Sequence, residues 1–385
     1  MRRLRIGVLY GGRSSEHEVS LASAASVMAN LDKRRYEAVP IRIDRDGRWS
    51  IPDKPPTTFV AGEVIARARQ EGDRPPRGGR ETYLVPHPGE ETLLTVERAG
   101  GETASRENAC VTGLALDVIF PVLHGPYGED GTVQGLLELA GVPYVGSGVM
   151  GSAVAMDKAM MKTAFAGRRL PIVDHLVVWR DEWERSPDAV AARVGERLSF
   201  PAFVKPANLG SSVGISKVKD AGDLAAAMRL AAEFDRKIVI EAGVPAAREI
   251  ECAVIGNDRP EASRPGEIEP SREFYDYEAK YVEESRAIVP APLDEATTAE
   301  VRRLAAEAFL AVEAAGFARV DFLLSRETGR IYVNEINTIP GFTTISMFPR
   351  LWEATGLGYP ALLDRLVDLA FERHAERQRL RTSHP

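Results

Sequence analysis

Two stretches toward the C-terminus carry oxygen ligands at a spacing that suits a metal ion. Asp321 lies in RVDFLL (319–324), and Glu335 and Asn337 lie in YVNEIN (332–337). Both stretches are otherwise apolar and typical of strands, on which residues two apart point to the same face. Oxygens that converge from two strands suit Mg²⁺, which takes few protein ligands and keeps positions for water and substrate phosphates. The alternative, the polar face of an exposed hairpin, does not explain why acids interrupt such apolar strands.

The stretch FVKPANLGSSVGISKV (203–218) combines a lysine with a glycine-rich loop. Lysine is rare here, nine against 40 arginines, so each lysine marks a position that needs a compact ammonium. Lys205 falls inside an apolar strand and must be paired or functional, because burying an unpaired ammonium is very costly. The backbone N–H groups and hydroxyls of residues 210–214 could wrap phosphate oxygens, although the P-loop pattern is absent. A strand-edge lysine followed by an ordinary glycine hairpin explains the spacing equally well.

Three further positions are weaker candidates by themselves. Glu16 is left over once Ser15 and Glu18 are interpreted as a capping box, and a solvated acid at a helix start is its simplest interpretation. His124 follows a strand, where α/β folds place ligands, but a lone histidine there is more often structural. Gly341 could present its backbone N–H to a developing oxyanion. None of the three decides a function alone.

Hydrophobic periodicity predicts three groups of elements that would position these residues. The first is an α/β unit with strands at 5–10, 38–43 and 116–123 and helices at 18–31 and 131–141. Its opening glycine pair, 11–12, lacks the GxGxxG pattern of a dinucleotide site. Residues 44–108, rich in proline, glycine and charge, predict a decorated surface with short strands.

The other two groups each predict a small sheet backed by helices. The second contains a helix at 146–165, strands at 200–206, 214–218 and 237–243, and a helix at 223–234. The third contains a strand at 248–256, a helix at 296–315 that Gly316 would cap, and strands at 318–325 and 330–337 joined by a turn. The charged residues 372–385 are typical of a fraying helix end.

Composition narrows the class of protein. The chain has 385 residues, 44% hydrophobic and 27% charged, enough for two or three cores. Its net charge is −7 and no basic block lies beside aromatics, which argues against a nucleic-acid partner and favours a small-molecule substrate. No apolar run approaches the roughly 20 residues of a membrane span, and none resembles a signal sequence. Cys110 and Cys252 alone indicate neither a disulfide framework nor a structural zinc, and we expect a reduced, cytoplasmic protein.

Six strings in order carry a family resemblance. They are HGPYGEDG (124–131), MDK (156–158), FVKPANLGSSVG (203–214), EFYDYEAKY (273–281), ARVDF (318–322) and NEINTIPGFT (334–343). From Gly11 to about Ser346 the chain resembles D-alanine–D-alanine ligases of the ATP-grasp superfamily. The resemblance implies an α/β protein with an N-terminal Rossmann-like domain at 1–147. Two α+β subdomains, at 148–241 and 242–385, would enclose ATP beneath a closing loop at about 257–290.

The resemblance also implies roles for individual residues, cofactors and partners. ATP would be bound by Lys158, Lys205, Gly210, Ser211, Ser212, Glu241, Glu249 and Lys280, and two Mg²⁺ ions, or Mn²⁺ in their place, by Asp321, Glu335 and Asn337. Catalysis would fall to Glu16, Ser211, Lys280, Tyr281, Arg319 and Gly341, and substrate binding to Glu16, His124, Arg319 and Ser346. The expected partners are two D-alanine molecules and a second copy of the chain, with no nucleic acid and no membrane.

In the family, the first D-alanine carboxylate attacks the γ-phosphate, and the amine of the second D-alanine then displaces phosphate to form the dipeptide for peptidoglycan. The EAKY ending, with Lys280 and Tyr281, favours an amine acceptor, since ligases that use D-lactate have a histidine in this region. A D-alanine–D-lactate ligase and a non-catalytic nucleotide sensor are the alternatives; a biotin-dependent carboxylase lacks this loop pattern. After Glu241 the chain reads AGVPAA, without the basic residue some members carry at the adenine hinge.

Overall fold

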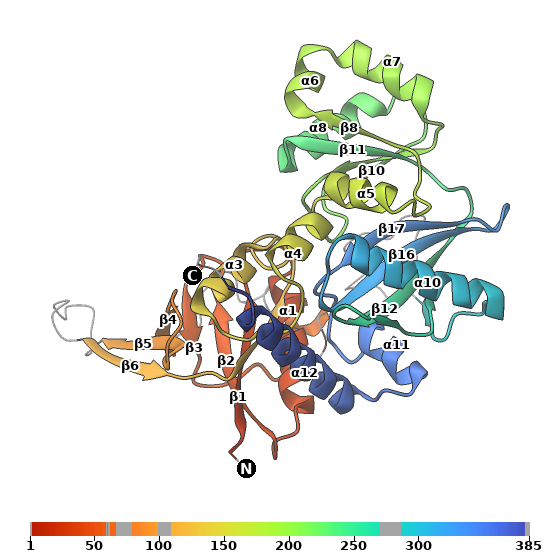
Figure 1. Ribbon diagram of the computed structural model, residues 1–385. Helices are drawn as coiled ribbons and strands as arrows, with labels where there is room; N and C mark the ends of the chain where they lie inside the picture. Colours follow the sequence, from red (N-terminus) through yellow and green to blue (C-terminus); the bar gives the residue numbers. More distant parts are fainter. Residues whose placement is uncertain are drawn as a thin grey trace.

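Three β-sheets organise the chain in the computed structural model, which describes residues 2–58, 60, 62–66, 79–98, 109–269 and 286–381. The sheets have seven, four and six strands and follow one another along the chain. With their helices they form an N-terminal, a central and a C-terminal lobe (Figure 1). The mixed α/β class expected from the sequence is confirmed.

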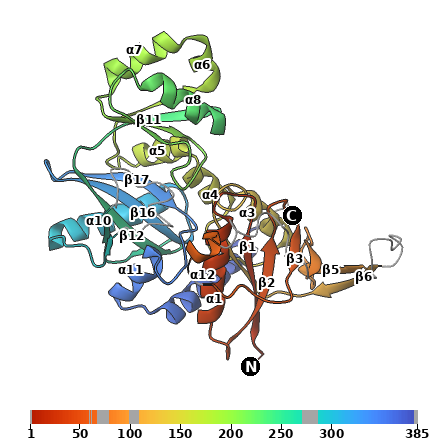
Figure 2. The ribbon, with the colours of Figure 1, turned by 180° about the vertical axis from the view of Figure 1, so that it is seen from behind.

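The N-terminal sheet has the order β6-β5-β4-β3-β2-β1-β7. Its parallel core is β2-β1-β7, and β1 and β7 are almost wholly buried, as expected for strands covered on both faces. The short strands predicted within 44–108 extend this sheet as an antiparallel arm, which projects from the molecule (Figure 2). The elements are β1 (Leu4–Gly11), α1 (His17–Asn30), β2 (Tyr36–Ile43), β3 (Trp49–Ile51), β4 (Arg80–Leu84), β5 (Leu93–Arg98), β6 (Ala109–Leu114), β7 (Val118–Leu123) and α3 (Thr132–Ala140).

The turn between β1 and α1 differs from the predicted capping box. The helix begins at His17, so Glu16 occupies the N-cap position, and its side chain makes no capping hydrogen bond. Glu18 instead accepts a hydrogen bond of 2.6 Å from the Arg45 guanidinium. The capping-box interpretation is therefore wrong. In the same turn, Gly11 has a φ of 92°, and a Cβ there would lie 2.2 Å from the Ile43 carbonyl oxygen, so this position requires glycine.

The central sheet, β10-β9-β11-β8, is antiparallel throughout. The single helix predicted at 146–165 is two helices, α4 and α5, because Asp157 has an extended backbone between them. Its carboxylate accepts hydrogen bonds from the N–H groups of Ala159 and Met160 and so caps α5. The elements are α4 (Val149–Met156), α5 (Lys158–Gly167), β8 (His175–Trp179), α6 (Arg180–Arg185), α7 (Pro187–Arg197), β9 (Ala202–Pro206), β10 (Ser216–Val218), α8 (Leu224–Phe234) and β11 (Lys237–Ala242).

The C-terminal sheet has the order β15-β14-β12-β16-β17, with β13 paired to β12. Gly316 does not cap α10, which ends at Ala311; it opens β16 with a φ of 72°, and a Cβ there would lie 2.8 Å from the Gly146 nitrogen. Close approach of the two lobes at this point therefore requires glycine. The elements are β12 (Ala247–Gly256), β13 (Glu261–Ala262), β14 (Gly266–Glu269), β15 (Arg286–Ile288), α10 (Glu295–Ala311), β16 (Gly316–Ser325), β17 (Ile331–Asn337), α11 (Met347–Thr355) and α12 (Tyr359–Gln378).

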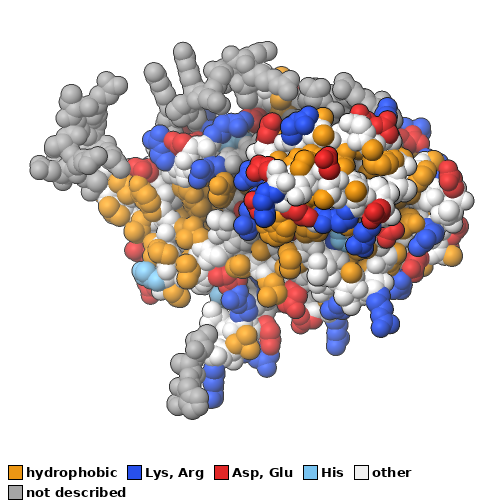
Figure 3. All heavy atoms as spheres, turned by 90° about the horizontal axis from the view of Figure 1, so that it is seen from above, with side chains coloured by type: hydrophobic (Ala, Val, Ile, Leu, Met, Phe, Trp, Pro, Cys, Tyr) orange, Lys and Arg blue, Asp and Glu red, His pale blue; other side chains and the backbone are white. Residues whose placement is uncertain are grey.

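The largest hydrophobic core joins the two ends of the chain. It contains residues of β1, β7 and α12 together with Phe317 of β16. The Phe317 ring lies 5.3 Å from that of Phe342 and 6.4 Å from that of Phe120. The central lobe has a separate core, and on the face where this lobe is in view, acidic and basic side chains are intermixed (Figure 3). Within the described residues, no helix has the length and apolar character needed to span a membrane.

Candidate active site

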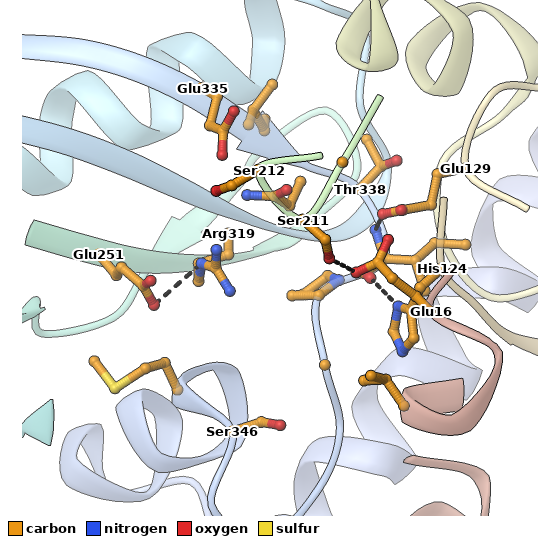
Figure 4. Close-up of a pocket in the computed structure, with 18 of the residues that line it drawn as sticks. Glu16, His124, Glu129, Ser211, Ser212, Glu251, Arg319, Glu335, Thr338 and Ser346 are labelled. Atoms are coloured by element: carbon orange, nitrogen blue, oxygen red, sulfur yellow. Dashed lines mark hydrogen bonds and ion pairs between the residues drawn. The ribbon is translucent and has the colours of Figure 1, made fainter. Parts of the chain in front are cut away.

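A cavity of about 650 Å³ lies where the three lobes meet. Its wall includes Glu16 and His124 from the N-terminal lobe, Lys158 from the central lobe, and Arg319 and Glu335 from the C-terminal lobe. Figure 4 shows Glu16, His124, Arg319 and Glu335 approaching the hollow from different elements. Residues that lie more than 300 positions apart in the sequence therefore share one site.

Glu16 and the glycine-rich loop are joined directly. The Ser211 hydroxyl donates a hydrogen bond to Glu16, which is buried (Figure 4). Ser211 and Ser212 have φ values of 51° and 57°, and Gly214 has 73°. Successive left-handed residues turn backbone N–H groups to one side, which is the geometry of an anion-binding concavity. Because Glu16 is buried, it is not the solvated acid at a helix start that was the simplest interpretation of the sequence.

Lys158 connects this loop to the C-terminal sheet. Its backbone N–H donates to the Ala207 carbonyl at 2.9 Å, and its ammonium donates to the Leu209 carbonyl at 2.7 Å. The same ammonium lies 3.9 Å from the Glu335 carboxylate. The ammonium therefore lies between Leu209, which precedes the glycine-rich loop, and the predicted metal ligand Glu335.

Lys205 is paired, as its place in an apolar strand requires. Its ammonium is 2.7 Å from one Glu241 oxygen, and the fully buried Lys162 is 3.1 Å from the other. Burial alone would raise the pKa of Glu241, but the two ammonium groups lower it well below its usual value. Burial lowers the pKa of Lys162, while the Glu241 charge outweighs burial and raises that of Lys205. Lys162, Lys205 and Glu241 thus form a cluster of three paired charges.

Arg319 is held by carboxylates from neighbouring strands. It donates two hydrogen bonds to Asp321, at 2.6 and 2.7 Å, and lies 3.1 Å from Glu251 of β12. Burial would lower the pKa of Arg319, but Asp321 and Glu251 raise it well above its usual value. The guanidinium therefore remains a fixed positive charge in the cavity wall.

The predicted metal ligands lie together on β16 and β17. Asp321 and Glu335 are register partners, and the Asn337 amide donates to Asp321 at 3.0 Å. The described residues contain no cluster of three or more His, Cys, Asp and Glu side chains suited to a metal ion. The third predicted donor is an amide oxygen, and two carboxylates with one amide fit the oxygen preference of Mg²⁺.

His124 orients the loop that contains Gly341. Its Nδ1 lies 2.9 Å from the Ile339 carbonyl and therefore carries the proton, because a carbonyl only accepts. Its Nε2 lies 3.3 Å from the Ser23 hydroxyl, and burial lowers the pKa of His124. A Cβ on Gly341 would lie 2.9 Å from the Ser346 hydroxyl oxygen. A neutral histidine thus fixes the segment that leads to Gly341 and Ser346.

Most predicted site residues that the structure describes line the cavity. These are Glu16, His124, Lys158, Gly210, Ser211, Ser212, Arg319, Glu335, Asn337, Gly341 and Ser346. Asp321 adjoins the cavity through Arg319 and Asn337, and Lys205, Glu241 and Glu249 lie outside its lining. Lys280 and Tyr281 fall outside the described residues, as do residues 270–285 of the predicted closing loop.

Sequence reasoning missed three charged groups at the site. Lys162 lies one helical turn after Lys158, and the rarity of lysine was a signal that could have identified it. Glu251 alternates with Glu249 along β12, so it shares that residue's face of the strand. Glu129 stands in a string already noted, HGPYGEDG, but nothing in the sequence distinguished it from the adjacent Asp130.

Family models match most of the chain. Residues 5–147 match the model described as D-ala D-ala ligase N-terminus, and residues 165–368 match D-ala D-ala ligase C-terminus. The chain belongs to the D-alanine–D-alanine ligase family. Family membership explains why the six strings identified in the sequence occur in order.

Relatives match over nearly their whole length. The chain is 48% identical to D-alanine–D-alanine ligases of Heliobacterium modesticaldum and Solibacter usitatus, covering 98% of this chain and 98% of each relative. Among solved structures, the D-alanine–D-alanine ligase of Coxiella burnetii is similar with a TM-score of 0.80 and 35% identity, over 98% of this chain and 97% of that one. The VanG D-Ala:D-Ser ligase of Enterococcus faecalis has a TM-score of 0.76 and 31% identity, over 96% and 100%.

Proposed function

We propose that this protein joins two D-alanine molecules into D-alanyl-D-alanine with the conversion of ATP to ADP and phosphate, for peptidoglycan synthesis. The observation that carries the proposal is the single cavity in which Glu16, Ser211, Arg319 and Glu335 meet. Members of the family that are 48% identical over 98% of the chain carry the same activity in their names. An acid for an ammonium, a loop for phosphates and a fixed guanidinium suit the reaction.

The central and C-terminal lobes would act as an ATP-grasp pair, with boundaries at 148–241 and 242–385. The glycine-rich loop, Lys158 and Lys205 would hold the phosphates, and Glu241 and Glu249 would contact adenine and ribose. The Lys158 ammonium already bonds to the Leu209 carbonyl of the loop, which supports its place among the phosphates. Asp321, Glu335 and Asn337 would hold Mg²⁺, which supplies charge neutralisation to the phosphates.

The chain's own groups would then position two amino acids. Glu16 would bind the ammonium of the first D-alanine, whose carboxylate oxygen forms a bond to the γ-phosphorus as ADP leaves. Arg319 and the Gly341 N–H would face the oxyanion that forms when the second amine attacks the carbonyl carbon and phosphate leaves. Ser346 would receive the second carboxylate, since its hydroxyl lies beside Gly341.

The closing loop would complete the site. Lys280 would contact the transferred phosphate, and Tyr281 would join Ser211 and Glu16 across the closed cleft. Exclusion of water matters because an acyl phosphate hydrolyses readily. We also propose that the protein works in the cytoplasm as a homodimer, for which light scattering in solution is the test.

ATP-dependent phosphate release with D-alanine, compared with L-alanine, tests the proposal. We expect release only with D-alanine, ATP and Mg²⁺ together. Product analysis at neutral pH with D-alanine, D-serine and D-lactate as competing acceptors should give mainly the dipeptide of D-alanine. Phosphate release that is independent of D-alanine would instead indicate a nucleotide-binding protein without ligase activity.

A further inference from the structure

Glu129 is a carboxylate in the cavity wall to which the proposed reaction gives no role. It is partly buried and follows β7 in the loop 124–131. One oxygen accepts the Gly125 N–H at 2.6 Å, and the other accepts the Ile339 N–H at 3.3 Å. Two carboxylate oxygens offer about four acceptor positions, so these bonds leave room for a ligand donor.

Glu129 and Glu16 both lie close to Gly125. The Gly125 N–H bonds to Glu129, and a Cβ on Gly125 would lie 3.2 Å from a Glu16 oxygen. Gly125 has a φ of 77°, so glycine is favoured here on both counts. Figure 4 shows both carboxylates at one end of the cavity, beside the segment that follows β17.

The two acids at this end of the cavity, Glu16 and Glu129, favour a positively charged ligand. Burial and the charge of Glu16 raise the pKa of Glu129 to about 8, although hydrogen bonds from the Gly125 and Ile339 N–H groups and the charge of Arg319 lower it. His124, the other titratable group here, is buried with a lowered pKa and contributes no charge near neutral pH. A cation between the two carboxyl groups would oppose the rise in the pKa of Glu129 and favour the ionised form of both.

We infer that Glu129 shares with Glu16 the binding of the first amino acid's ammonium group, and that the pair rejects ligands without a positive charge at that position. This rests on the proposed function, which supplies the amino acid. Each ammonium–carboxylate hydrogen bond is charge-assisted, and losing one costs about tenfold or more in affinity.

Three variants test the inference: Glu129→Gln, which removes the charge, Glu129→Asp, which keeps it, and Glu138→Gln as a control. Glu138 lies on α3 and bonds to the Tyr144 hydroxyl. Rates measured against D-alanine concentration give separate KM values for the first and second sites. We expect Glu129→Gln to raise the first-site KM at least about tenfold, with the KM for ATP, the second-site KM and kcat changing far less. Glu129→Asp should restore part of the affinity, and Glu138→Gln should match the unmodified protein.

A first-site KM within about twofold of the unmodified value in Glu129→Gln would overturn the inference, as would equal changes in all three KM values with a lowered Tm. If that variant does not fold, first-site competition in Glu129→Asp decides. The preference for D-alanine over D-lactate, which has a neutral hydroxyl, should fall at least about threefold relative to the unmodified protein, and an unchanged preference would refute the pair. Failure of the ligase activity itself appears as no D-alanine-dependent phosphate release by the unmodified protein.

Discussion

At the scale of single residues, the site is a set of charges that hold one another in place. Arg319 binds both Asp321 and Glu251, and Lys205 and Lys162 share Glu241. Buried charges persist only when they are paired, and removing one partner leaves the other uncompensated. Each charge therefore affects both the geometry of the site and the stability of its lobe.

Arg319→Lys keeps the charge but loses the planar fork that bonds twice to Asp321. We expect kcat to fall about 10²-fold or more, because a single ammonium cannot reproduce the bidentate contact and also face an oxyanion. Phosphate release at saturating substrates measures the effect. Arg302→Lys is the matched control, because Arg302 lies on α10 and its guanidinium donates a hydrogen bond to the Ala262 carbonyl of β13. If Arg319→Lys kept more than about a tenth of the activity, the role assigned to Arg319 would be wrong.

Glu241 makes stability depend on acid pH. Its folded-state pKa lies below its ordinary value, so the stabilisation is complete above that ordinary value and is lost as pH falls through the folded pKa. Glu241→Gln should unfold at lower urea concentration at about pH 7, because Lys162 and Lys205 lose their partner. Its free energy of unfolding should also change less than that of the unmodified protein between about pH 5 and pH 3. Parallel pH curves for the two proteins would contradict this assignment.

At the scale of elements, a helix start fixes the glycine-rich loop. Asp157 caps α5, forms an ion pair with Lys237, and lies 3.3 Å from the Asn208 side-chain nitrogen. Asn208 immediately precedes Leu209, whose carbonyl accepts a hydrogen bond from the Lys158 ammonium. The break between α4 and α5 thus serves the site as well as the fold.

Asp157→Ala should therefore affect both stability and nucleotide binding. We expect the free energy of unfolding to fall by about 1–2 kcal/mol from loss of the cap, and the KM for ATP to rise severalfold because the loop loses an anchor. Asp294→Ala is the matched control, since Asp294 caps α10 by accepting the Thr297 N–H. It should lower the Tm and leave the KM for ATP unchanged. An equal effect of both variants on that KM would exclude the anchoring role.

At the scale of the whole molecule, the N-terminal and C-terminal lobes share a core. The core around Phe317 contains elements of both, whereas the central sheet packs around residues of its own lobe and helices α4 and α5 join the core of the C-terminal lobe. A shared core makes the two outer lobes unfold together.

Phe317→Ala should lower the free energy of unfolding by about 3–5 kcal/mol, since its ring is fully buried among three other phenylalanine rings. Hydrogen exchange followed by mass spectrometry should show faster exchange in β1, β7 and α12 as well as β16. Val178→Ala, in the central core, should instead increase exchange mainly in β8 to β11. Exchange confined to β16 in Phe317→Ala would show that the outer lobes are independent.

The sequence by itself determined what is local. Strand and helix positions followed from periodicity, and the errors, at Glu18, Asp157 and Gly316, came where a polar side chain or a close approach chose between local alternatives. The ordered motifs were enough to identify the family before any geometry was known.

Only the tertiary structure decided which charges meet. Ser211 and Glu16 lie 195 positions apart in the sequence, and Lys205 and Glu241 lie 36 apart. Neither pairing follows from the period of one element, because the first depends on how two lobes pack and the second on the pairing of β9 with β11. Glu129 likewise stood out only when the structure showed that it binds the Gly125 N–H and that Gly125 lies close to Glu16.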